Sequence, residues 1–130
     1  MLKIKRIIFL WLPPIVWMGL IFFLSSFHKL QVSEGIDDFI LRKIAHMVEY
    51  LILFLLLYRA IKNTTNYSIN KNLNFAFLFS MIYAFTDEFH QSFVLGRSGN
   101  LRDIAIDIMG IFLGWIFFKK WKKNKTKGEI

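Results

Sequence analysis

The chain lacks cysteine entirely, has few acidic residues, and carries proline only at positions 13 and 14. Without cysteine there is no disulfide, no thiol nucleophile and no thiolate metal site. Asp and Glu number 9 against 17 Lys and Arg, so the formal net charge is +8. In a soluble protein this excess would suggest nucleic acid as a partner. Here the charges lie between apolar runs, which instead favours orientation in a membrane with anionic inner-leaflet lipids.

The chain is rich in apolar residues. Of its 130 residues, 55% are hydrophobic, and Phe alone supplies 15 of them. A soluble domain of this size could not hide so much apolar surface from water. The length leaves room for a single domain, and no linker divides the chain into two domains. We therefore expect an all-α integral membrane protein in which four helices form one transmembrane bundle.

Four apolar stretches predict the membrane spans. They lie at about residues 7–24, 44–61, 73–92 and 101–120. The first includes an uncharged run of 18 residues, close to the length that crosses about 30 Å of hydrocarbon, and its two prolines predict a kink. The last two are long enough only if they take in the acidic residues Asp87, Glu88, Asp103 and Asp107. Ionisable groups are therefore expected at or below the membrane surface.

The basic residues predict which side faces the cytoplasm. With the N-terminus inside, 12 of the 17 Lys and Arg fall on the cytoplasmic side: 3 near the N-terminus, 3 around the linker after the second span and 6 in the tail. Positive charge collects on the cytoplasmic side of membrane proteins. We predict a multi-pass protein of the cell membrane with both termini cytoplasmic.

Under this topology the unusual polar residues converge on the outer side. They are Lys43, His46, Glu49 and Tyr50 at the start of the second helix, Asp87, Glu88, His90 and Gln91 in the third span, and Arg97, Arg102, Asp103 and Asp107 before and within the fourth. Ionisable groups in a bilayer cost several kcal/mol each, so they persist mostly when paired, hydrated or functional. We predict an outward-facing polar site, while a structural ion-pair network without any ligand stays open as the alternative.

A stripe of four residues marks the fourth span. Asp103, Asp107, Gly110 and Gly114 recur at intervals of 4, 3 and 4 residues and so share one helix face. The two glycines predict the close approach of another helix, which would draw the aspartates toward the interior of the bundle.

At these residues the chain resembles the VanZ-like family of small integral membrane proteins. The resemblance is carried by K-x-x-H-x-x-E-Y from Lys43 to Tyr50, by D-E-x-H-Q from Asp87 to Gln91, by the pair Gly96 and Arg97, and by Ser25, Ser26, Asp103, Gly110 and Gly114. Leu95 stands where the family commonly has Pro, and Asp107 stands where Asn is common. The resemblance implies a polytopic membrane protein of a family whose named member is associated with resistance to teicoplanin-type glycopeptide antibiotics, and it supplies no known reaction.

Two functions fit the predicted site. In the first, Lys43, Arg97 and Arg102 bind the headgroup of an anionic lipid or cell-wall precursor, because guanidinium groups match phosphate geometry. The remaining candidate ligand-binding residues are Tyr50, Asp87, Gln91, Asp103 and Asp107. The second is a membrane-embedded hydrolase or transferase acting on a lipid or lipid-linked headgroup. Its candidate catalytic residues are His46 or His90 as general base and Glu49 or Glu88 as acidic partner or proton donor, with Arg97 clamping the anion.

Two other classes fit less well. Divalent metal binding would use the histidines and carboxylates of the second and third spans, but the H-x-x-E spacing does not reproduce the zinc-binding helix HExxH, so no metal and no cofactor are predicted. A carrier or channel is disfavoured because four short helices form a narrow path unless they oligomerise. The expected partners are membrane lipids and a cell-wall precursor or lipid headgroup, with no nucleic acid, and an oligomer is compatible with the sequence.

Overall fold

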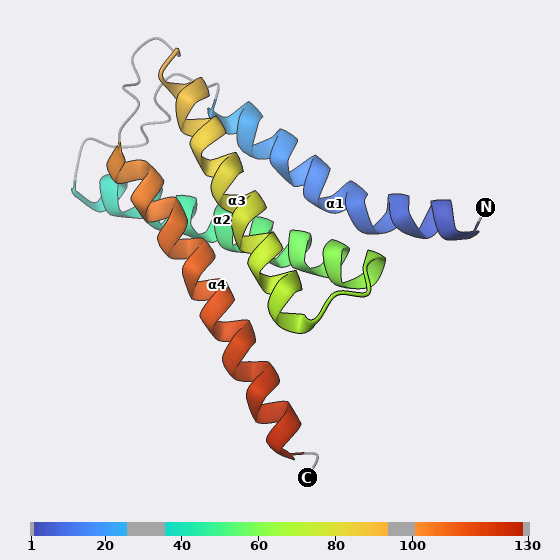
Figure 1. Cartoon of the computed structure of the whole chain (residues 1–130). Helices are drawn as coiled ribbons and strands as arrows, with labels where there is room; N and C mark the ends of the chain where they lie inside the picture. The colour runs from blue at the N-terminus through green and yellow to red at the C-terminus, as the bar shows by residue number, and fades with distance from the viewer. Residues whose placement is uncertain (1, 26–35, 94–100, 129–130) are drawn as a thin grey trace.

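The computed structural model describes residues 2–25, 36–93 and 101–128, and over these ranges every regular element is a helix. The helices are α1 (Leu2–Ser25), α2 (Ile36–Thr64), α3 (Ile69–Gln91) and α4 (Leu101–Gly128) (Figure 1). The predicted all-α class is therefore confirmed for the described residues. The predicted spans at 7–24, 44–61 and 101–120 each lie within one helix, and the span at 73–92 ends one residue beyond α3.

Two described helices are long and apolar enough to cross a membrane by length and composition. They are α1, over Leu2–Leu24, and α2, over Lys43–Thr64. Polar residues interrupt the apolar stretches of α3 and α4, as the sequence predicts. A membrane crossing by all four helices, and the side on which the termini lie, stay predictions.

Helix α2 is the centre of the fold. It contacts each of the other three helices, as α3 also does, whereas α1 and α4 make no contact with each other within the described ranges. Its buried side chains Tyr50, Leu53, Phe54, Leu57, Tyr58 and Ile61 form most of the apolar core. The large apolar side chains of α1 are mostly exposed, which suits a helix that faces lipid on its outer side.

Small residues line the buried face of α3. Ala76, Ser80 and Ala84 follow one another at four-residue intervals, and each is completely buried. Between helices in a bilayer the hydrophobic effect supplies no driving force, so association depends on close packing, which small side chains allow. Asp87 continues this face by a further turn and is thereby carried into the interior.

Close contact between α4 and α2 depends on the glycine pair. A Cβ at Gly110 would meet the backbone of Met47 in α2, with the Met47 carbonyl carbon 3.0 Å and its Cα 3.1 Å away. A Cβ at Gly114 would lie 2.7 Å from Cδ1 of Leu51. The helix approach predicted from the glycines is confirmed, and Asp107, one turn before Gly110, is 2% exposed.

Helix α1 is attached to the bundle by two hydrogen bonds to main-chain carbonyls. The indole N–H of Trp17 donates to the carbonyl of Glu49 in α2 at 2.9 Å. The hydroxyl of Tyr83 in α3 donates to the carbonyl of Met18. Figure 1 shows α1 bending along its length, with its N-terminal part leading away from the other helices. Both prolines lie inside this helix, which explains the bend.

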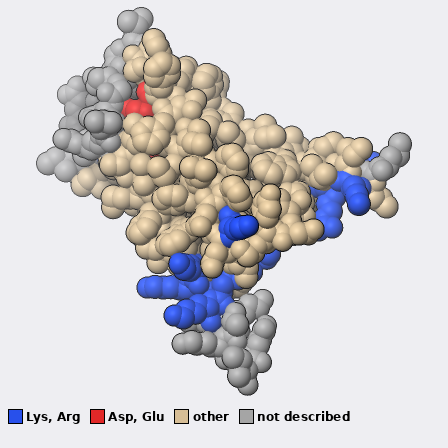
Figure 2. Space-filling model, viewed as in Figure 1, with Lys and Arg blue, Asp and Glu red and all other residues tan. Residues whose placement is uncertain are grey.

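Charged side chains are segregated along the helices. The described carboxylates Glu49, Asp87, Glu88 and Asp107 lie in the first half of α2, the last turns of α3 and the first turns of α4. Most described Lys and Arg lie toward the opposite helix ends, and Figure 2 shows them gathered away from the visible acidic atoms. Lys43, at the acidic end, is the exception among the described basic side chains.

Candidate functional site

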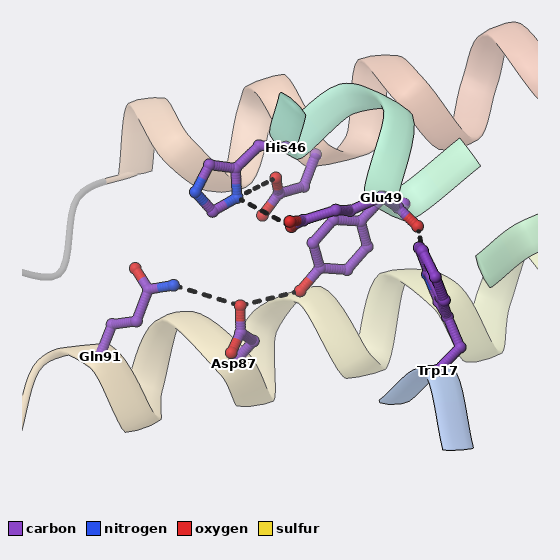
Figure 3. Close-up of polar contacts among 7 residues, drawn as sticks. Trp17, His46, Glu49, Asp87 and Gln91 are labelled. Carbon is purple, nitrogen blue, oxygen red and sulfur yellow. Dashed lines mark hydrogen bonds and ion pairs between the residues drawn. The ribbon is translucent and has the colours of Figure 1, made fainter. Parts of the chain in front are cut away.

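Polar side chains of α2 and α4 meet at the acidic end of the bundle (Figure 3). Nδ1 of His46 lies 3.5 Å from Oδ1 of Asp107 in α4. The same nitrogen lies 3.9 Å from Oε2 of Glu49, which follows three residues later on α2. Met47 adjoins His46, and it is the residue whose backbone packs against Gly110. The close contact between the helices thus sets the distance from imidazole to carboxylate.

The exposure of the three side chains differs. The side chains of His46 and Glu49 are 23% and 24% exposed, whereas Asp107 is 2% exposed. A partly exposed imidazole therefore lies over a covered carboxylate. If Nδ1 carries the proton and donates toward Asp107, the lone pair is on Nε2, where the imidazole can accept a proton.

A second polar group joins α2 to α3. The hydroxyl of Tyr50 donates to Oδ2 of Asp87 at 3.0 Å, and the side-chain amide of Gln91 donates to the same oxygen at 3.2 Å. Tyr50 is completely buried, and Asp87 and Gln91 are 3% and 4% exposed. The other oxygen of Asp87 is buried and has no hydrogen-bond partner among the described residues. A buried carboxylate is stable only when its oxygens are compensated, so this oxygen is a position for a further donor.

The remaining predicted residues of α2 and α3 are placed differently. Glu88 is 5% exposed and lies next to Asp87. Lys43 lies one turn before His46 and is half-buried. The His90 ring stacks on Phe22 of α1 at 4.1 Å between ring centroids. Of the two predicted bases, His46 lies near Asp107 and Glu49, and the ring of His90 lies against α1.

Three predicted residues cannot be placed in this geometry. Arg97 lies outside the described residues, as do Gly96 and Leu95. Arg102 and Asp103 belong to the first turn of α4, but their side chains are outside the described set. Their part in the site stays a prediction.

Sequence reasoning missed the contribution of α1 to the site. Trp17 bonds to the carbonyl of Glu49, and Phe22 covers His90. Tyr83, which also bonds to α1, has its ring centroid 6.4 Å from that of Tyr50. The sequence does contain a feature that predicts bonds from Trp17 and Tyr83: a polar N–H or O–H within an apolar run needs a partner when it is buried.

The described side chains offer little to a metal ion. No group of three or more His, Asp or Glu side chains is arranged to hold one, as far as the structure describes them. The metal alternative therefore gains no support from the histidine and carboxylates that meet here.

Comparison with known proteins gives one match. A model of the VanZ/LLP1 family matches residues 9–122, a stretch that includes every polar residue named above. No curated protein and no solved structure matches the chain.

Proposed function

Because the chain belongs to the VanZ/LLP1 family, we propose that it is a multi-pass membrane protein whose polar site binds the headgroup of an anionic lipid or cell-envelope precursor. In this proposal all four helices cross the bilayer and both termini are cytoplasmic. The length and composition of α1 and α2 support a membrane location. The separation of Lys and Arg from the acidic end supports the orientation.

The observation that carries the proposal is the meeting of buried ionisable groups from three helices. Asp87 and Asp107 are 3% and 2% exposed, and both lie within reach of polar side chains of α2. Each such group is unfavourable in a bilayer, and a protein retains it mostly for pairing or for function. Several buried ionisable groups lie together at one end of a bundle whose sides are apolar. A functional site explains this arrangement best.

The cations of the site supply the affinity for a headgroup. The described part of the cluster contains more carboxylates than bases, so it would not attract an anion alone. In our proposal Lys43, Arg97 and Arg102 bind the phosphate, because guanidinium groups form paired hydrogen bonds with its oxygens. The carboxylates then hold these basic side chains in position, and the second oxygen of Asp87 accepts from one of them.

Lipid identification on the purified protein tests this proposal. Native mass spectrometry is expected to find an anionic lipid or lipid-linked species on the wild type and to lose it in Arg97→Ala. The matched control is Arg59→Ala, since Arg59 lies near the other end of α2, 5.3 Å from the ring centroid of Phe9. Equal lipid profiles in Arg97→Ala and the wild type, with both proteins in the membrane fraction, would refute headgroup binding.

Arg97→Ala and a second variant, His46→Ala, test the biological role that the family suggests. We propose that expression of the wild type raises the concentration of teicoplanin needed to stop growth, and that Arg97→Ala and His46→Ala do not. Both variants should remain in the membrane at wild-type amounts. Protection by both variants at the wild-type level would separate the site from resistance.

One observation favours a second candidate, a membrane-embedded hydrolase or transferase. Nδ1 of His46 faces Asp107 and Glu49 at 3.5 and 3.9 Å, an arrangement in which a carboxylate orients an imidazole that acts as general base. Such a base contributes about 10²- to 10⁴-fold to a rate. In hydrolysis, His46 would take the proton of a water molecule that attacks the phosphorus, and the leaving alcohol would receive that proton.

Turnover distinguishes the two candidates. Protein in nanodiscs is incubated with headgroup-labelled lipid, and the released headgroup is measured. An enzyme releases the headgroup at a rate that falls at least about 100-fold in His46→Ala, while the lipid stays bound. If the wild type binds the lipid and releases nothing, the binding function alone remains.

A further inference from the structure

A cavity lies at the end of the bundle opposite the polar site. Its volume is about 330 Å³, and it is lined by Lys119, Lys122 and Lys123 of α4 and by Ser68, Ile69, Asn70 and Leu73 at the start of α3. Figure 2 shows Lys and Arg side chains gathered toward this end of the molecule. The start of α3 and the later turns of α4 therefore form a pocket of these seven residues, the basic pocket.

The charge of the basic pocket calls for an anion. Three lysines line one small volume, and none of the residues that line it carries a carboxylate. The described acidic side chains lie toward the other end of the helices. Like charges at short distance repel unless an opposite charge lies between them, so a ligand with an acidic group fits here.

The apolar surroundings of the pocket indicate an amphiphile. Leu73 in its wall is 1% exposed, and Nζ of Lys119 lies 4.6 Å from the ring centroid of Trp115. Nζ of Lys122 lies 5.9 Å from the ring centroid of Trp121. Tryptophan and lysine side chains that lie together near a helix end are typical of the boundary between hydrocarbon and headgroups, where both residue types anchor a helix. A soluble phosphate would use the charges and leave these apolar groups without a role.

We propose that the basic pocket binds the phosphodiester of an anionic phospholipid, in the cytoplasmic leaflet of the proposed topology. The lipid enters from the surrounding leaflet, its phosphate meets the three lysines, and its chains continue along α3 and α4. The basic pocket shares no residue with the polar site at the other end, so either proposal can be refuted without the other.

A comparison of anionic and zwitterionic lipid binding tests the proposal for the basic pocket. The full chain is purified in detergent, and phosphatidylglycerol and phosphatidylcholine binding are measured by native mass spectrometry. Each lysine near an anionic surface contributes about fivefold in affinity, equivalent to about 1 kcal/mol. The triple variant Lys119→Gln, Lys122→Gln, Lys123→Gln is therefore expected to lose about 100-fold in affinity for phosphatidylglycerol, with no change for phosphatidylcholine.

A matched control removes the same charge elsewhere. The triple variant Lys3→Gln, Lys5→Gln, Arg6→Gln alters three exposed residues of α1 that do not line the pocket. It should keep its affinity for phosphatidylglycerol within about twofold, because it leaves the short-range contacts intact. An equal loss of affinity in both triple variants would show that the lipid is held by general surface attraction, which would overturn the proposal. Wild-type affinity in the variant of Lys119, Lys122 and Lys123 would also overturn it.

Two further arms complete the test. Asn70→Glu places a carboxylate on the exposed first turn of α3 beside the lysines, a position where acidic residues favour helix formation. This variant is expected to fold and to bind phosphatidylglycerol more weakly. Unchanged binding would contradict the proposal even if the triple variant does not fold. Soluble glycerol phosphate should not displace the lipid. If it displaces the lipid at equal concentration, the ligand of the pocket is a soluble phosphate compound and the lipid proposal is overturned.

Discussion

The contact between Gly110 and α2 gives the sharpest test of the fold. In Gly110→Ala the new Cβ would lie against the backbone of Met47, 3.0 Å from its carbonyl carbon and closer to its carbonyl oxygen. A main-chain group cannot rotate away as the end of a side chain can, so one helix must shift. Overpacking of this kind costs about 1–3 kcal/mol, and we expect a loss of about 2–3 kcal/mol in the free energy of unfolding because the obstacle is backbone.

Two other glycines provide controls for this variant. Gly19→Ala should be neutral or stabilising by up to about 1 kcal/mol, since nothing lies within 4 Å of its Cβ position and alanine favours helix formation. Gly114→Ala should lie between the two, because its obstacles are the side chains of Leu51 and Phe54. Unfolding is followed by circular dichroism as the SDS fraction of mixed micelles rises. If Gly110→Ala is as stable as Gly19→Ala, α2 and α4 do not pack as described.

Further substitutions test the polar contacts by the same measurement. Tyr50→Phe removes one donor from the buried carboxylate of Asp87 and should cost about 1–2 kcal/mol, whereas the control Tyr67→Phe, at an exposed position, should change little; equal effects would argue against the buried bond. Trp17→Phe removes the donor to the Glu49 carbonyl and should cost about 0.6–1.7 kcal/mol; wild-type stability would show that α1 is held without it.

The sequence predicts helix faces better than contacts between helices. The intervals between Asp107, Gly110 and Gly114 correctly predict a buried stripe that another helix approaches. The apolar runs likewise predict the four helices. Both features depend on the 3.6-residue period, which is a local property of the chain.

The partners across the bundle could not be predicted in this way. His46 and Glu49 share a local motif, yet the shorter distance from His46 is to Asp107 on another helix. His90 resembles His46 in the sequence but stacks on Phe22. Which residue meets which depends on the rotation of each helix about its axis and on the crossing angles, and these are set by packing over many residues. The predicted roles of Arg97 and Arg102 stay predictions, because Arg97 and the side chain of Arg102 lie outside the described residues.

The attachment of α1 has a consequence for the order of assembly during synthesis. Its indole donor at Trp17 bonds to a carbonyl 32 residues later in the chain, and its acceptor at Met18 bonds to a hydroxyl 65 residues later. At translation rates of about 5–20 residues per second, the first partner follows after about 2–6 s and the second after about 3–13 s. The first helix is therefore synthesised before either of these partners exists, and it reaches its final position only after the third helix has been made.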